Sequence, residues 1–232
     1  MTQRNPFKYF KTSPEIIKLA VMYYVRFPLS LRQVEDILHE RGIDVCHETI
    51  RFWWNRFGPL FAKEIKQKRV GCHSNWRLHV DEVFVKVNGK QHYLWRAIDH
   101  EGTVLESVVT KRRDRRAALK MLRKLLSKHG SPHEIVTDKF RSYGAALREL
   151  KLQNRHETGQ YQNNQSENSH LHFRRRERAM CLFRSMGSLQ KFTSLHGSIF
   201  NHFSHQRHLE KRKNFKQLRA QSLIDWRRLT MA

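Results

Sequence analysis

Three acidic residues stand where a carboxylate needs an explanation. Asp81 lies inside the largely apolar run of residues 78–85, Asp138 follows the short apolar run 134–137, and Glu167 lies near the start of a long helical stretch. Desolvating a carboxylate among apolar neighbours is costly unless a cation or hydrogen-bond donors compensate. Carboxylate oxygens suit Mg²⁺ or Mn²⁺, and two such ions about 3.5–4 Å apart stabilise the attacking and leaving oxygens of a phosphodiester. If the three residues converge, they predict metal-assisted phosphoryl transfer.

Each acid also has a purely structural interpretation. Asp81 and Glu82 could form an exposed pair on an edge strand, Asp138 could be a turn residue, and Glu167 could close a capping box with Asn164. Taken singly, these interpretations are favoured. Taken as an ordered set on successive elements, the three acids favour catalysis.

The elements around these acids alternate between strands and helices. Residues 77–90 alternate and end in Asn88-Gly89, a strong hairpin signal, and strands at 91–98 and 103–110 follow. Asp114 predicts the start of a helix that Gly130 ends, and a strand at 134–137 and a helix at 143–152 come next. Three strands, a helix, a strand and a helix predict an α/β fold, a mixed sheet flanked by helices.

The N-terminal part predicts three short helices. Ser13 and Ser30 are helix-start signals, Gly42 ends the second helix, and residues 45–57 form the third. On the first helix the spacing assigns Ile16, Leu19, Ala20, Tyr23 and Tyr24 to the apolar face. The pattern resembles a helix-turn-helix unit, in which the third helix would turn Arg51, Asn55 and Arg56 toward the major groove of DNA. The alternative is a three-helix bundle whose charged face is simply solvated.

The charge balance supports a polyanionic partner. The chain has 45 Lys and Arg residues and 21 Asp and Glu residues, so its net charge is 45 − 21 = +24, and its pI is near 10.6. This charge points first to nucleic acid and second to an anionic membrane as the partner. The apolar run 16–25 is interrupted by Lys18 and is too short to span a bilayer, and no secretory signal is visible, so we expect a cytoplasmic protein. The three cysteines are widely spaced, which favours reduced thiols over disulfides. The sequence has no glycine-rich phosphate-binding loop, so we expect no bound nucleotide.

The C-terminal part is helical and basic. Residues 182–203 have apolar helical spacing, and His202, His205 and His208 follow at three-residue steps. A zinc site would need a supporting carboxylate or thiolate pattern, so we favour a helix that packs on the core and contacts phosphate.

Several motifs in order resemble the short DDE transposases of the bacterial insertion-sequence-six family. They are Trp76 with Val80-Asp81-Glu82, Asn88-Gly89 with residues 93–99, Thr137-Asp138-Lys139 with Tyr143-Gly144, and Asn163-Asn164-x-x-Glu167-Asn168. The resemblance implies a ribonuclease-H-like core at 76–185, a helix-turn-helix domain at 1–60, a basic connector at 61–75 and a basic helical segment at 186–232. It implies that Asp81, Asp138 and Glu167 hold two Mg²⁺ or Mn²⁺ ions, although the interval 167 − 138 = 29 is shorter than in many members.

The family commonly carries a basic residue seven positions after its glutamate, which here is Arg174, on nearly the same helix face as Glu167. We expect Arg174 and its neighbours Arg175, Arg176 and Arg178 to contact DNA; the alternative is a solvated basic run.

The implied function is transposition. The protein would bind terminal inverted repeats on double-stranded DNA as a homodimer or larger assembly, cut strand ends, and join the 3′-hydroxyl to target DNA, by the replicative route. Two alternatives remain: a DNA-binding protein without catalysis, either a regulator or an inactive element copy, and a resolvase-like nuclease with the same core.

Overall fold

The computed structural model describes residues 5–68, 76–159, 164–180, 183–205 and 210–230, without the side chains of 164–168. The chain forms two compact units, one of Met1–Arg69 with Ser198–Ala232 and one of Val70–Gly197. These bounds differ from the expected division at 60, 75 and 185, because the C-terminal residues fold with the N-terminal helices.

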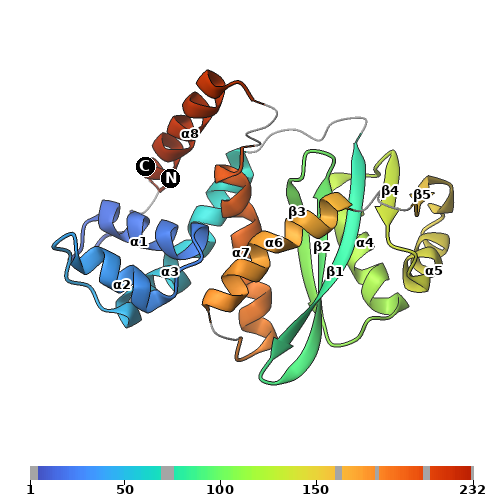
Figure 1. The fold of residues 1–232 in the computed structure, drawn as a ribbon, viewed down its shortest axis with the longest axis horizontal. Helices are drawn as coiled ribbons and strands as arrows, with labels where there is room; N and C mark the ends of the chain where they lie inside the picture. The colour runs from blue at the N-terminus through green and yellow to red at the C-terminus, as the bar shows by residue number, and fades with distance from the viewer. Residues whose placement is uncertain (1–4, 69–75, 160–163, 181–182, 206–209, 231–232) are drawn as a thin grey trace. The chain divides into compact units, whose positions relative to one another are not determined.

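The unit of Val70–Gly197 contains a mixed five-stranded sheet of order β3-β2-β1-β4-β5 (Figure 1). The antiparallel strands β1 (Arg77–Val87), β2 (Lys90–Asp99) and β3 (Val104–Thr110) come first along the chain. The strand β4 (Glu134–Thr137) pairs parallel with β1, and β5 (His156–Glu157) pairs parallel with β4. Because β1 is central, the edge-strand interpretation of Asp81 and Glu82 is wrong.

The predicted hairpin between β1 and β2 is confirmed. Asn88 and Gly89 both have positive φ, 48° and 77°, as a two-residue turn between twisted antiparallel strands requires. This turn sets the register that places Asp81 directly opposite Arg96 and Glu82 opposite Trp95.

One face of the sheet is covered by α4 (Arg115–His129) and α5 (Arg141–Glu149). Asp114 caps α4 by accepting the N–H of Ala117 at 2.9 Å, as the sequence predicts. The core between these layers includes Leu78 and Val80 of β1, Trp95 of β2 and Tyr143 of α5. The helix α5 begins two residues before the expected start at 143, and β4 has its predicted bounds.

The other face is contacted by α6 (Asn164–Ala179) and the first part of α7 (Met186–Phe203). The Gln190 side-chain amide of α7 accepts the N–H of Val109 at 2.8 Å and donates to the Ser107 carbonyl at 2.9 Å. These two bonds to the β3 backbone attach α7 to the edge of the sheet. The predicted mixed sheet flanked by helices is therefore confirmed (Figure 1).

The other unit contains α1 (Pro14–Arg26), α2 (Leu31–His39), α3 (His47–Lys68) and α8 (Arg212–Arg227). Ser13 and Ser30 are the N-caps of α1 and α2, as predicted, and Ser30 forms a capping box with Gln33. The helix α8 packs on α1, where Trp226 donates to the Lys18 carbonyl at 3.1 Å and Lys18 donates to the Arg227 carbonyl at 2.7 Å.

One expectation about these helices is wrong and another is only partly right. The third helix runs to Lys68, through Pro59, so residues 61–68 of the expected connector are helical, and Phe61 and Ile65 are buried. Of the residues assigned to the apolar face of α1, two are buried, Ala20 and Tyr24, and three are only half-buried, Ile16, Leu19 and Tyr23. Ile17 and Val21 are buried as well. This helix is apolar on most of its surface, so its own pattern does not decide which face other elements cover.

The C-terminal histidines pack against α8. His202 hydrogen-bonds with the Ser222 carbonyl and His205 with the Ser222 hydroxyl, each at 2.8 Å, whereas His208 lies outside the described residues. His202 and His205 therefore pack on α8 in the unit of the N-terminal helices rather than on the sheet, and the expected phosphate contact stays a prediction. In the described part of the chain, no helix is long and apolar enough to cross a membrane.

Candidate active site

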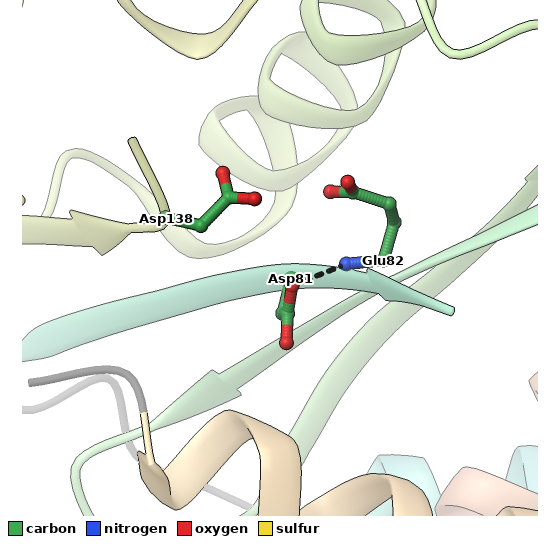
Figure 2. Close-up of side chains that lie close together, drawn as sticks. All are labelled: Asp81, Glu82 and Asp138. Atoms are coloured by element: carbon green, nitrogen blue, oxygen red, sulfur yellow. Dashed lines mark hydrogen bonds between the residues drawn. The ribbon is translucent and has the colours of Figure 1, made fainter. Parts of the chain in front are cut away.

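Asp81 lies in the middle of the central strand and faces α6. Successive strand residues point to opposite faces, so Val80 and Glu82 face α4 and α5 while Asp81 faces the other way. Figure 2 shows Asp81 pointing away from the side on which Glu82 and Asp138 lie. Its Oδ2 hydrogen-bonds with Nε2 of His170 on α6 at 3.2 Å, and its Oδ1 accepts the N–H of Glu82 at 2.8 Å. The first predicted aspartate is therefore tied to the helix that carries Glu167.

Glu82 is a buried carboxylate whose side chain is 2% exposed. The Tyr143 hydroxyl donates to its Oε2 at 2.5 Å, and Arg113 forms an ion pair with its Oε1. Burial raises the pKa of Glu82, the Tyr143 hydrogen bond lowers it in part, and the charge of Asp138 raises it further. The cost of burying this charge is therefore met only partly by its partners.

Asp138 follows β4 and keeps more contact with solvent, its side chain being 36% exposed. Its Oδ1 accepts the N–H of Phe140 at 3.1 Å and its Oδ2 accepts from Arg113 at 3.0 Å. Burial is the largest influence on the pKa of Asp138 and raises it, against the lowering effects of Phe140 and Arg113. Two donors from different elements thus fix the orientation of this carboxylate.

Asp81, Glu82 and Asp138 form one acidic cluster (Figure 2). A carboxylate oxygen of each lies within 4.8 Å of those of the other two. The structure therefore brings together the two aspartates that the sequence singled out, and it adds Glu82, which the sequence reasoning missed. The alternation of β1 was the available signal, because Glu82 shares the inward face of Leu78 and Val80.

Glu167 lies on α6, and its side chain is outside the described residues. Residues three and four apart on a helix are neighbours on its surface, so Glu167 precedes His170 on one face and Arg174 follows it. His170 itself reaches Asp81, so it marks the side of α6 that contacts β1.

The arginines of α6 differ in exposure. Arg175 and Arg178 are exposed, and half-buried Arg174 pairs with Glu177 at 2.5 Å. Arg176 is 2% exposed, and its guanidinium lies 5.7 Å from the centre of the Phe192 ring. The predicted DNA contact of Arg176 is therefore wrong, because this position faces α7 and the core rather than solvent.

On α3 the predicted DNA-facing residues Arg51, Asn55 and Arg56 are all exposed, on one face that also carries exposed Phe52. Arg51 pairs with Glu48 at 2.8 Å, and the Arg56 guanidinium lies 5.8 Å from the centre of the Phe10 ring. Free Cys46 is exposed near the start of this helix. The face is open and carries cationic and aromatic groups.

The chain is similar to known proteins over most of its length. A family model described as a DDE domain matches residues 75–206, more than half of the chain. The transposase of the insertion sequence-like element IS431mec from Staphylococcus aureus strain N315 is 35% identical over 178 residues, 75% of this chain and 79% of that protein. The transposase of IS257 in transposon Tn4003, also from S. aureus, is 34% identical over the same shares.

Solved structures are more distant. The Mos1 transposase catalytic domain has a TM-score of 0.37 and 14% identity over 71% of this chain and 90% of that one. A chain of the simian T-cell lymphotropic virus intasome has a TM-score of 0.44 and 16% identity over 86% of this chain and 71% of that one. The family assignment depends instead on the family model and the sequence relatives. The chain belongs to the insertion-sequence-six family of DDE transposases, metal-dependent polynucleotidyl transferases that carry out insertion-sequence transposition.

Proposed function

We propose that this transposase cuts and joins DNA strands with Asp81, Asp138 and Glu167 as the carboxylates that hold two Mg²⁺ or Mn²⁺ ions. The observation that carries the proposal is the approach of the carboxylates of Asp81, on β1, and Asp138, directly after β4, within 4.8 Å. The position of Glu167 on α6 supports the third assignment, since His170 on the same face reaches Asp81.

The acidic cluster suits hard divalent cations by its chemistry. Its donors are carboxylate oxygens, and burial raises the pKa of both Glu82 and Asp138, so a cation would stabilise the ionised forms. When bound at such carboxylates, Mg²⁺ or Mn²⁺ polarises phosphate oxygens and makes a bound water a better nucleophile.

The chain's own residues orient the carboxylates. His170 fixes Asp81 from α6, while Arg113 and the Phe140 N–H fix Asp138 from the opposite side of the strand. Held in this way, the oxygens need little rearrangement when the phosphodiester arrives, which is the advantage of a preorganised site. Arg174, Arg175 and Arg178 would then supply positive charge for the phosphates of the DNA.

We assign recognition of the terminal inverted repeats to α3, through Arg51, Asn55 and Arg56. Their common exposed face supports this role. Two element ends must be held together during transfer, so we propose a dimer or larger assembly on DNA. We also propose that transposition is replicative and that the protein acts in the cytoplasm.

The test is strand transfer with purified protein, a labelled duplex that carries the terminal repeat, and a target plasmid. We expect joined product with Mg²⁺ or Mn²⁺, and none with EDTA or with Asp81→Asn, Asp138→Asn or Glu167→Gln. The matched control is Glu157→Gln, an exposed acid on β5 that should keep transfer. Retained end binding in the inactive variants would separate chemistry from recognition. Transfer by any of the three would remove that residue from the set, and binding without any transfer by the unmutated protein would favour a regulator or inactive copy.

A further inference from the structure

Arg113 has a specific position beside the acidic cluster. It lies between β3 and α4, with its side chain 27% exposed. One guanidinium nitrogen, Nη2, contacts both Glu82 and Asp138, and the guanidinium carbon lies 3.7 Å from the centre of the Phe140 ring. A planar guanidinium held by two carboxylates and an aromatic face has little freedom to move.

Glu82 anchors this arginine to the core. Its carboxylate is 2% exposed and accepts from the hydroxyl of Tyr143, whose ring is fully buried among the residues between the sheet and α5. The contacts therefore run from Tyr143 to Glu82, from Glu82 to Arg113, and from Arg113 to Asp138. Of these side chains, Asp138 has the most exposed one.

We propose that Arg113 is a positioning residue for Asp138 and that buried Glu82 holds Arg113 in place. The proposal rests on the proposed role of Asp138 in metal binding. The Phe140 N–H fixes only Oδ1 of Asp138, so Arg113 is the donor that fixes Oδ2. Partners of ligating carboxylates typically change metal affinity about 10–100-fold when they are removed.

The sign of the effect separates positioning from competition. A cation next to a carboxylate opposes the binding of a second cation, so if Arg113 only competed for Asp138, its removal would strengthen metal binding. If Arg113 orients Asp138, its removal weakens metal binding although a positive charge has been lost. We expect the second result, because Arg113 is held by Glu82 and Phe140 independently of Asp138.

The experiment compares Arg113→Gln, the double variant Glu82→Gln/Arg113→Gln, and Arg112→Gln as a matched control that removes an exposed neighbouring charge. Thermal unfolding in EDTA reports on the fold, and Mn²⁺ titrated without DNA, with free Mn²⁺ followed by electron paramagnetic resonance, reports on the site. Asp138→Asn is included as the reference for loss of the site itself.

We expect Arg113→Gln to bind Mn²⁺ roughly 10-fold more weakly and to unfold about 5 °C lower, because Glu82 is left buried without its cation. The double variant should regain most of the thermal stability, since both charges are gone, but not the Mn²⁺ affinity. Arg112→Gln should match the unmutated protein in both measurements.

Three outcomes would overturn the inference: tighter Mn²⁺ binding by Arg113→Gln, unchanged binding, or recovery of affinity by the double variant, which would leave Arg113 only a counterion for Glu82. If Asp138→Asn bound Mn²⁺ as well as the unmutated protein, the proposed metal site itself would fail, which is a distinguishable result.

Discussion

Arg96 is a buried cation on the central part of the sheet, and its removal should stabilise the protein while harming its activity. It lies on β2 opposite Asp81, is 3% exposed, and donates to the Ser169 carbonyl of α6 at 2.9 Å. Burial lowers the pKa of Arg96 from 12.5 to about 10. The folded state therefore binds this proton much less tightly than the unfolded state does.

The magnitude follows from that difference. At about 1.4 kcal/mol for each tenfold change in proton affinity, holding Arg96 charged costs the folded state ~3 kcal/mol at neutral pH. The substitution Arg96→Met removes the charge and keeps an apolar side chain that can fill the site. It also takes a donor from the Ser169 carbonyl, which costs about 1–2 kcal/mol. The expected net effect is a gain of about 1–2 kcal/mol in the free energy of unfolding.

Activity should change in the opposite direction. The Ser169 carbonyl lies two residues beyond Glu167 on α6, so Arg96 anchors the helix where Glu167 must approach the aspartates. Without that anchor, strand transfer should fall about tenfold or more, since small displacements of catalytic groups have effects of this size. A more stable but less active variant would be an instance of the trade-off between stability and function.

Urea unfolding of both proteins at pH 7 and near pH 11 tests the reasoning. Because the pKa of Arg96 is lower in the folded state, the unfolded state binds more protons between about pH 10 and 12.5, and the unmutated protein gains stability as the pH rises through that window. The advantage of Arg96→Met should therefore shrink above pH 10. The control Arg116→Met, at an exposed arginine of α4, should stay within about 0.5 kcal/mol. A variant clearly less stable at pH 7, or a difference independent of pH, would refute the argument.

Further predictions concern a helix cap, a buried acid and the DNA-facing helix. Ser30→Ala removes the acceptor for the Gln33 N–H and should cost about 1 kcal/mol in urea unfolding, whereas Ser30→Asp should cost little; equal losses would contradict the capping role. Glu106 is buried and bonded to Lys128 at 2.6 Å, and although burial raises its pKa, the lysine partners lower it overall. The ionised Glu106 carboxylate therefore contributes to the free energy of unfolding above pH 4.5, and this contribution is lost in acid. Glu106→Gln should lower the free energy of unfolding by about 2 kcal/mol at pH 7 and by much less near pH 3. A loss that does not change with pH would exclude the ionic explanation. Arg56→Ala should weaken repeat binding and reduce its salt dependence by about one charge, as measured by titration at several salt concentrations; an unchanged slope would exclude a phosphate contact.

Local signals predicted most of the sheet. Alternation and the Asn88-Gly89 turn fix β1 and β2, and Asp114 and Gly130 bound α4 as expected, because each of these features depends on a few consecutive residues. The burial of Glu82 could not be predicted with the same certainty. It depends on Arg113 and Tyr143, which lie 31 and 61 residues away along the chain and reach Glu82 only after the sheet and helices have packed.

The errors have a related cause. Arg176 belongs to a run of arginines that looks solvated, and only the packing of α7 against α6 decides that this one is buried. The helix α3 continues past Pro59 because burying Phe57, Phe61 and Ile65 outweighs the hydrogen bond that proline cannot donate. In each case tertiary contacts override a correct local rule.

The adjacent pair Asp81-Glu82 shows why this site depends on both layers of helices. Because neighbouring residues of β1 point to opposite faces, Asp81 is held by His170 of α6 and Glu82 by Tyr143 of α5. The position of the Asp81 carboxylate therefore depends on α6, and that of the Glu82 carboxylate depends on α5, although both residues lie on the central strand with their carboxylates near Asp138. A change in the packing of either layer must then alter the distance between carboxylates, even without touching them. The geometry of the acidic cluster is therefore a property of the whole unit rather than of one strand.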